Sequence, residues 1–267
     1  MSASTAYSVE ERQRLIKEYI EEVKRVHVND LVELFHVSAS TMRNDLTALE
    51  RNGLIKRTHG WAISLSVARV GKESFVSTRM QDNIQEKESI ALAANQEIES
   101  GDTIAVLAGT TTMALAQTLM NKQDLTVVVN DLNIAKWLDD NTDHKVFILG
   151  GFVRKHYYYV DFDESIVDKI NVDKAFFSCT GFSLAKGATV SDYDLAISQK
   201  KILMRANKTI LLCDSTKFGE VYFARICSAE DINMVITDGN ISRENLEILR
   251  SQDDIQFLVA NQKAYYL

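Results

Sequence analysis

Short apolar segments alternate with amphipathic ones across residues 83–267, and no other feature limits the fold of that region as strongly. Seven short runs are rich in Val, Ile, Leu or Phe: Thr103–Leu107, Thr126–Val129, Lys145–Leu149, Lys174–Cys179, Thr209–Cys213, Met234–Thr237 and Ile255–Val259. Helical spacing characterises the stretches that separate most of these runs: Thr112–Met120, Leu132–Asp139, Glu164–Ile170, Asp194–Ala206 and Ser242–Arg250. Near-continuous apolar strands that alternate with helices predict an α/β domain with a mostly parallel sheet, covered on both faces.

The first 65 residues follow a different pattern. Val9–Arg25 carries its apolar residues on one helical face, which predicts an amphipathic first helix. We expect Asn29 to cap a short second helix, Asp30–His36, and Ser38 to cap a third helix that Asn52 and the following glycine end. Two helices joined by a tight turn indicate a helix-turn-helix.

The third helix has one apolar face and one polar face. Met42, Leu46 and Leu49 share the first, and hydroxyl, guanidinium and amide groups occupy the second. Such groups read base edges and phosphates. The candidate DNA-binding residues of this region are therefore Ser38, Ser40, Thr41, Arg43 and Asn44.

An alternating segment, Leu54–Ile63, follows the third helix and predicts a two-stranded wing with a turn near His59 and Gly60. We expect Lys56, Arg57 and His59 to contact the phosphate backbone of DNA. The sequence thus predicts a winged helix-turn-helix domain over residues 1–65, a polar linker over 66–82 and an α/β domain over 83–267.

The net charge of −7 does not exclude a nucleic-acid partner, because the charge is unevenly distributed. Residues 1–65 hold nine basic and nine acidic side chains, so the whole excess lies in the larger domain. No apolar run is long enough for a membrane span and no signal peptide is recognisable, so we expect a cytoplasmic protein without a membrane partner. The three cysteines lack the spacing of a zinc site, so we expect free thiols, no metal and no cofactor.

Five predicted strands of the α/β domain end in glycine or polar residues, where ligands bind in such sheets. The first is followed by Gly109 and three threonines that open a helix, which suits a phosphate, although threonine there is often only a cap. Lys200, on the helix before the fifth strand, could add a cation. The candidate effector-binding residues are Gly109, Thr110, Thr111, Thr112, Asn130, Gly150, Gly151, Thr180, Gly181, Lys200, Asp214 and Lys217.

Both regions resemble the DeoR family of bacterial transcriptional regulators. The N-terminal resemblance rests on Val37–Leu46, Leu49-Glu50, Gly53–Ile55 and the basic wing that ends at His59-Gly60, with Trp61 in place of the second glycine that is usual there. The C-terminal region is similar to the family's sensor, whose fold is related to ribose-5-phosphate isomerases. This resemblance implies that Gly109–Thr112 hold a phosphate and that the other candidate residues line the pocket or engage the sugar.

Several pocket positions depart from the family pattern. Leu107 and Ala108 replace an Asp-Ser pair, Ala196 replaces a glutamate and Asp161 lies near a usual glycine. The two lost carboxylates weaken hydroxyl recognition and also argue against an enzyme, because sugar isomerisation requires a positioned general base.

The sequence as a whole favours a non-enzymatic repressor of carbohydrate-metabolism genes. It would bind double-stranded operator DNA as a homo-oligomer, a dimer or a tetramer, and would be relieved by a phosphorylated sugar. Two alternatives remain open. The sensor domain has lost its ligand and serves only oligomerisation, or the chain is a phosphosugar isomerase with an added DNA-binding-like domain.

Overall fold

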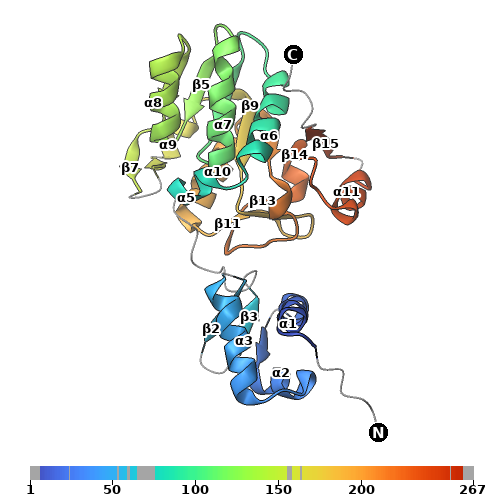
Figure 1. Cartoon of the computed structure of the whole chain (residues 1–267). Helices are drawn as coiled ribbons and strands as arrows, with labels where there is room; N and C mark the ends of the chain where they lie inside the picture. Colours follow the sequence, from blue (N-terminus) through green and yellow to red (C-terminus); the bar gives the residue numbers. More distant parts are fainter. Residues whose placement is uncertain are drawn as a thin grey trace. The chain divides into compact units, whose positions relative to one another are not determined.

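The computed structural model describes residues 7–23, 25–52, 54–58, 61–64, 76–154, 158–162, 164–252 and 254–260. The chain forms two compact units, residues 1–72 and 73–267 (Figure 1), and each is described by itself. None of the helices within these described residues is long and apolar enough to cross a membrane.

Three helices and a small antiparallel sheet make up the first unit. Its elements are α1 (Val9–Val23), β1 (Arg25–His27), α2 (Val28–Phe35), α3 (Ala39–Arg51), β2 (Ile55–Thr58) and β3 (Trp61–Ser64), with strand order β1-β3-β2. Buried Ile16 and Ile20 of α1 pack with Leu31 of α2 and with Met42 and Leu46 of α3. The predicted winged helix-turn-helix is therefore confirmed, with β1 as an unpredicted third strand of the wing sheet.

The caps of the helices follow the sequence in one case and differ in the other. Ser38 caps α3 as predicted, because its hydroxyl accepts a hydrogen bond from the Thr41 amide at 3.1 Å. The prediction of Asn29 as the cap of α2 is wrong. Strand β1 leads directly into α2, so the cap is His27, whose Nδ1 accepts from the Asn29 amide at 3.3 Å. The predicted wing turn at His59 lies outside the described residues.

All seven predicted strands of the second unit form one parallel sheet. They are β4 (Thr103–Val106), β5 (Thr126–Val129), β6 (Lys145–Ile148), β9 (Val172–Ser178), β12 (Ala206–Leu212), β14 (Met234–Asp238) and β15 (Gln256–Ala260), in the order β15-β14-β12-β9-β4-β5-β6. Every pairing between neighbours is parallel. The mostly parallel α/β fold is confirmed.

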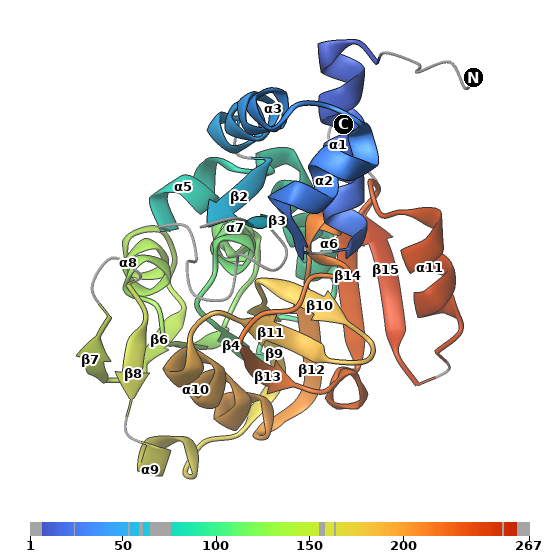
Figure 2. The same cartoon turned by 90° about the horizontal axis from the view of Figure 1, so that it is seen from below.

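Helices cover both faces of this sheet. They are α5 (Val76–Gln81), α6 (Ile84–Gln96), α7 (Thr110–Thr118), α8 (Leu132–Asn141), α9 (Glu164–Val167), α10 (Tyr193–Leu203) and α11 (Arg243–Arg250). Figure 2 shows α7 and α8 on one face and α9 and α10 on the other. Two hydrophobic cores result, because successive strand residues face opposite sides: Ile104 and Val106 pack with Leu115 of α7, whereas Ala105 packs with Ile202 of α10.

Several short elements of the second unit were not predicted. They are the hairpin of β7 (Gly151–Val153) and β8 (Val160–Phe162), an antiparallel sheet of β10 (Gly181–Ser183), β11 (Gly187–Val190) and β13 (Ala224–Cys227), and the 3-10 turns η1 (Leu119–Asn121), η2 (Ser215–Lys217) and η3 (Ala229–Asp231). Helix α5 lies inside the segment predicted as a linker, so residues 76–81 are ordered secondary structure of the second unit.

Candidate functional site

The polar face of α3 carries the residues expected to read DNA. Ser38, Ser40, Arg43 and Asn44 are exposed, and Thr41 is half-buried. The Ser38 hydroxyl lies 2.8 Å from the hydroxyls of both Ser40 and Thr41, so these three groups form one network at the start of the helix. Lys56 and Arg57 lie on β2. Among the candidate residues of α3, Arg43 and Asn44 are exposed and lie outside this hydroxyl network.

A buried ion pair between α1 and α3 escaped the sequence reasoning. The Asp45 carboxylate is only 3% exposed and accepts hydrogen bonds from Arg12 Nε at 2.6 Å, Arg12 Nη2 at 3.3 Å and Gln13 Nε2 at 3.0 Å. Asp45 directly follows the outward-facing Arg43 and Asn44. The pair therefore fixes the helix that presents them.

A pocket lies where the strand order of the parallel sheet reverses. β5 and β6 are added on one side of β4, whereas β9, β12, β14 and β15 are added in turn on its other side. The loops that follow β4 and β9 therefore diverge and leave a crevice between them, the usual ligand position in open parallel sheets. Gly109 caps α7 there, and a Cβ at this position would lie 2.1 Å from Ser178 Oγ, so the Ser178 hydroxyl would have to move.

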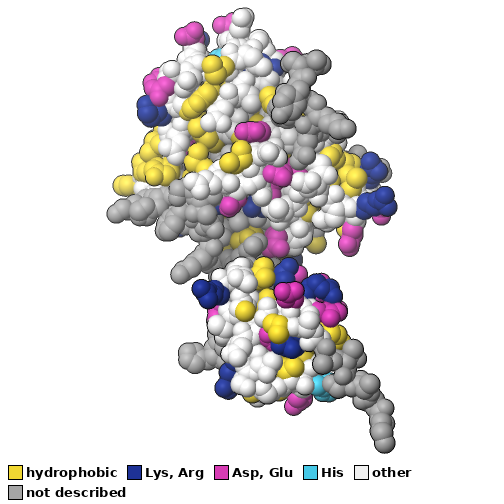
Figure 3. All heavy atoms as spheres, in the orientation of Figure 1, with side chains coloured by type: hydrophobic (Ala, Val, Ile, Leu, Met, Phe, Trp, Pro, Cys, Tyr) yellow, Lys and Arg dark blue, Asp and Glu magenta, His cyan; other side chains and the backbone are white. Residues whose placement is uncertain are grey.

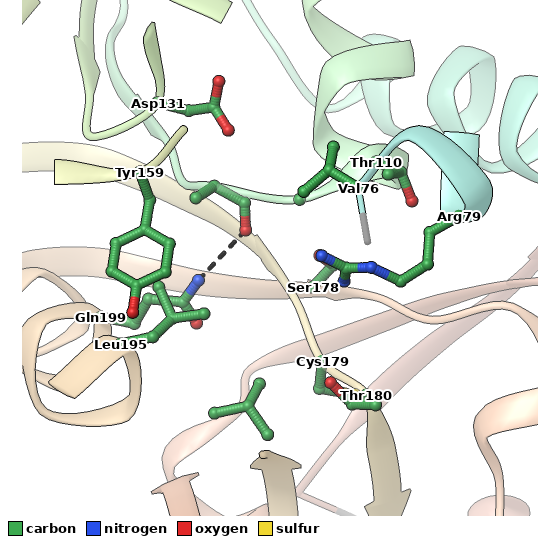
Figure 4. A pocket seen from close by; sticks show the side chains of 13 residues that line it. Val76, Arg79, Thr110, Asp131, Tyr159, Ser178, Cys179, Thr180, Leu195 and Gln199 are labelled. Atoms are coloured by element: carbon green, nitrogen blue, oxygen red, sulfur yellow. Dashed lines mark hydrogen bonds between the residues drawn. The ribbon is translucent and has the colours of Figure 1, made fainter. Parts of the chain in front are cut away.

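The pocket has two lobes that share five residues. One lobe lies next to α10 and the other next to α6. Both are lined by Arg79, Thr110, Ser178, Cys179 and Thr180. Figure 4 shows the Arg79 side chain extending from α5 into the α10-side lobe. We call them the α10 lobe and the α6 lobe.

Cations are concentrated in the α6 lobe. Lys87 and Lys217 join Arg79 there, opposite the carboxylates of Asp82 and Asp214. Asp214 already accepts hydrogen bonds from the Thr216 amide and from Asn83 Nδ2, at 3.2 and 3.3 Å. Lys87 is 7% exposed, and burial lowers its pKa, an effect that the charge of Lys217 adds to and that of Asp214 opposes. An anion in this lobe would relieve the repulsion between the cations.

The α10 lobe is mostly uncharged and contains a buried amide. Gln199 is fully buried and donates from Nε2 to the carbonyl of Ala108 at 3.2 Å (Figure 4), while its Oε1 has no partner among the described residues. Asp131 lines the same lobe and caps α8 by accepting from the amides of Asn133 and Ile134. Burial raises the pKa of Asp131 to about 6, against the lowering effects of these two amides and of Arg79.

Six of the predicted effector-binding residues converge on the two lobes: Gly109, Thr110, Thr111, Thr180, Asp214 and Lys217. Two others support the loop after β4 from behind. Thr112 Oγ1 donates to the Gly109 carbonyl at 2.9 Å, and Asn130 Oδ1 accepts from the Ala108 amide at 2.8 Å.

The remaining predicted residues do not line either lobe. Lys200 is exposed on α10, because one residue along a helix turns the side chain by about 100°, and Gln199 holds the inward position. Gly150 and Gly151 are exposed at the far strand β6 and in β7. Gly181 is buried at the start of β10, where a Cβ would lie 2.4 Å from the Glu220 carbonyl oxygen.

The pocket also contains residues that the sequence reasoning missed. Val76 and Arg79 come from the predicted linker, Ser178 and Cys179 end a predicted strand, and Asp131, Leu195 and Gln199 belong to predicted helices or their caps. Position at a strand end was an available signal for Ser178 and Cys179. Of the residues that depart from the family pattern, Ala108 lines the α10 lobe, whereas Leu107 and Ala196 are packed in the core; Asp161 lies in β8.

The cysteines are free thiols, as expected. Burial raises the pKa of Cys213 strongly and that of Cys227 to about 12. Within the described residues, no cluster of His, Cys, Asp and Glu side chains could hold a metal ion.

Comparison with known proteins agrees with this architecture. Residues 12–67 match the DeoR-like helix-turn-helix domain, and residues 82–239 match the DeoR C terminal sensor domain. The HTH-type transcriptional regulator GolR of Listeria innocua is 35% identical over 87% of this chain and 92% of its own length. The HTH-type transcriptional repressor GlcR of Bacillus subtilis is 30% identical over 95% and 97%. Ribose 5-phosphate isomerase A of Methanocaldococcus jannaschii is similar over 50% of this chain and 54% of its own, with 15% identity and a TM-score of 0.39. The chain belongs to the DeoR family of helix-turn-helix, DNA-binding transcriptional regulators.

Proposed function

We propose that this regulator represses carbohydrate-metabolism genes by binding operator DNA, and that a phosphorylated sugar in the pocket of the second unit releases it. The observation that carries the proposal is the convergence of Arg79, Lys87 and Lys217 with the start of α7 on the α6 lobe. The relative named as a repressor supports the sign of the regulation.

A phosphate suits the α6 lobe for two reasons. The first turn of α7 offers backbone amides without helical partners at the positive end of the helix dipole, beside the hydroxyls of Thr110 and Thr111. Three cations face two carboxylates in the same lobe, so a bound dianion would be surrounded by an excess of positive charge.

A sugar suits the adjoining α10 lobe. Gln199 Oε1 is a buried acceptor that a ligand hydroxyl could satisfy, and an unpaired buried acceptor costs about 1–3 kcal/mol. Asp131 and Thr180 supply further polar groups, while Leu195 and Tyr159 provide apolar walls. A molecule with a phosphate at one end and a small neutral polyol at the other matches this division.

Operator binding would use α3 together with the wing. Arg43 and Asn44 face outward from α3 and would contact bases or phosphates, with Lys56 and Arg57 of β2 on the backbone. One short helix buries too little surface for specific affinity, so we propose that two copies bind two half-sites.

A candidate surface for self-association lies at the edge of the large sheet. Edge strand β6 exposes Phe147 and Ile148, and β7 exposes Phe152 and Val153. Figure 3 shows apolar side chains gathered at this side of the second unit. A second copy would cover them, and Phe152→Glu is expected to shift the mass measured by light scattering toward the monomer.

The test of the sensing function is a binding screen with the full chain. Glucose 6-phosphate, fructose 6-phosphate, ribose 5-phosphate and inorganic phosphate are added in a thermal-shift assay, and stabilising compounds are then tested for release of labelled operator DNA. Lys217→Ala should strongly reduce the thermal shift at the same compound concentration. Lys200→Ala is the matched control, because that lysine is exposed on α10 outside both lobes, and should leave the shift unchanged.

The outcomes separate the competing functions. Stabilisation together with operator release supports the proposal, whereas a flat response to the whole panel favours a sensor domain that serves only oligomerisation. Interconversion of aldose and ketose phosphates by the purified protein would favour an isomerase. Arg43→Ala should abolish specific operator binding, while Arg51→Ala, an exposed change at the end of the same helix, should leave most of it intact.

A further inference from the structure

We infer that Arg79 binds the effector and that α5, which carries it, is the element through which an occupied pocket acts on operator binding. The inference rests on the proposed function and adds a residue and a route to it. Arg79 lines both lobes. It is also carried by the first described element after residues 65–75, through which the chain passes from the first unit to the second.

Helix α5 contributes to the pocket directly. The side chain of Val76 is buried and lines the α10 lobe, and the Arg79 side chain reaches into the same lobe beside Thr110 and Ser178 (Figure 4). The charge of Arg79 also acts on Asp131, whose pKa it lowers against the larger raising effect of burial. An anion in the shared part of the pocket would therefore lie next to a group that belongs to α5.

The C-terminal end of α5 is anchored to the sensor core by a buried cation. Lys87 of α6 donates its ammonium to the carbonyls of Arg79 and Asp82. Asn83 joins the two helices in a left-handed conformation, with φ 51°, and its side chain donates to Asp214 at 3.3 Å. This end of α5 is thus tied to the rim of the α6 lobe, while its other end follows residues 65–75 in the sequence.

A helix of six residues has little stability of its own, so these contacts decide whether α5 keeps its place. Arg79 can make a charge-assisted bond to a bound anion only when α5 lies against the pocket. The effector consequently stabilises the docked position of α5, and a ligand shifts an equilibrium only through such a difference in affinity.

The other cations of the pocket differ from Arg79 in their position along the chain. Lys217 lies in η2 after β12, within the sensor core. It would contribute to effector affinity without transmitting the binding event to the DNA-binding unit. Replacement of Lys217 should therefore weaken binding but permit full operator release at saturation, whereas replacement of Arg79 should limit release even at saturation.

The experiment compares Arg79→Met, Arg79→Lys and Lys217→Ala in the full chain. Operator affinity is measured by fluorescence anisotropy at increasing glucose 6-phosphate or ribose 5-phosphate, whichever stabilises the wild type more. In the wild type, saturation should lower operator affinity by about 5- to 150-fold, the usual range of allosteric coupling. Lys217→Ala should show the same maximal loss of operator affinity, at a probe concentration roughly tenfold higher. In Arg79→Met, the loss of operator affinity at saturation should stay below about twofold, and in Arg79→Lys it should lie between those of Arg79→Met and the wild type.

Hydrogen exchange provides a readout that does not depend on DNA. The probe, or inorganic phosphate, should protect the amides of residues 76–82 and 109–113 in the wild type, and only those of 109–113 in Arg79→Met. Full operator release from Arg79→Met, or unchanged exchange of α5 in the wild type, overturns the inference. Protection of α5 without operator release overturns the proposed sensing function and the route to DNA, and leaves Arg79 as an anion ligand alone. Melting temperatures of the variants identify any that fail to fold. If Arg79→Met does not fold, the operator release and hydrogen exchange of Arg79→Lys test the inference instead.

Discussion

Removal of Arg12 should destabilise the DNA-binding unit far more than removal of Arg14, although the two side chains lie on the same helix. Arg12→Ala leaves the Asp45 carboxylate, 3% exposed, without its cation. Breaking a buried pair in this way typically costs about 3–5 kcal/mol. Gln13 still donates to Asp45 at 3.0 Å, which places the expected loss in the free energy of unfolding near the lower limit, at about 3 kcal/mol.

Arg14→Ala is the matched control. Arg14 pairs with Glu18 across one turn of α1, and the two side chains are 58% and 52% exposed, so the loss should be about 0.5 kcal/mol or less. In a unit of this size, a loss of about 3 kcal/mol lowers the melting temperature by roughly 12–24 °C.

The chain has two tryptophans, Trp61 in β3 and Trp137 in α8. In a Trp137→Phe background, Trp61 fluorescence therefore follows unfolding of the first unit alone. Equal melting temperatures for Arg12→Ala and Arg14→Ala would refute the claim that the Arg12–Asp45 pair holds α3. The double variant Arg12→Met/Asp45→Leu should recover most of the stability, because replacing both charges leaves neither unpaired.

Three further expectations concern the sensor domain. Gly181→Ala should destabilise it by about 1–3 kcal/mol in urea unfolding, because the new Cβ would meet the backbone of Glu220. The control is Gly150→Ala, whose Cβ meets nothing within 4 Å, so its stability should be unchanged. Equal effects of the two substitutions would contradict the explanation by close packing at Gly181. Asp131→Asn keeps the cap of α8 but removes a carboxyl whose protonated form the fold favours. In the wild type, the protonated Asp131 carboxyl contributes its full stability below pH 3.8, and this contribution is lost as pH rises through about 6. Asp131→Asn should therefore raise the free energy of unfolding at pH 7.5 by up to about 3 kcal/mol. A gain that does not depend on pH would contradict this reasoning. Gln199→Leu should leave the melting temperature nearly unchanged yet weaken effector binding about tenfold in calorimetry, and undiminished binding would mean that Oε1 does not receive a ligand hydroxyl.

The large sheet was predictable because its strands are buried on both faces. Such strands are apolar without interruption, as in Val127–Val129, and the run itself marks the element. The strands β7, β8 and β10 have no comparable signal, because three residues are too few to show a period, and each is defined by its pairing with a neighbouring short strand. Helix α5 is also short: its sequence is polar, and its order depends on Lys87, which follows it along the chain.

The pocket was predictable only in part. Strand ends and a helix start identified Gly109, Thr110, Thr180 and Lys217, because these features depend on local sequence and on the topology of parallel sheets. To predict which residues of α10 face the sheet, the rotation of the helix about its axis must be known to within one residue, and hydrophobic periodicity does not define it that closely. The sequence therefore pointed to Lys200, although the structure places its neighbour Gln199 in the pocket.

The reversal of strand order between β4 and β9 also determines when the pocket comes into existence during synthesis. β4, β5 and β6 can pair once about residue 150 has emerged, but β9 begins only at Val172 and β12 at Ala206. At about 5–20 residues per second, the inner edge of β4 stays open for several seconds after the strand is made. No effector can assist folding in that interval, because Ser178 to Thr180 are not yet in place. The nascent sensor domain therefore passes through a stage with an open strand edge, and at that stage it has no complete pocket for a ligand to stabilise.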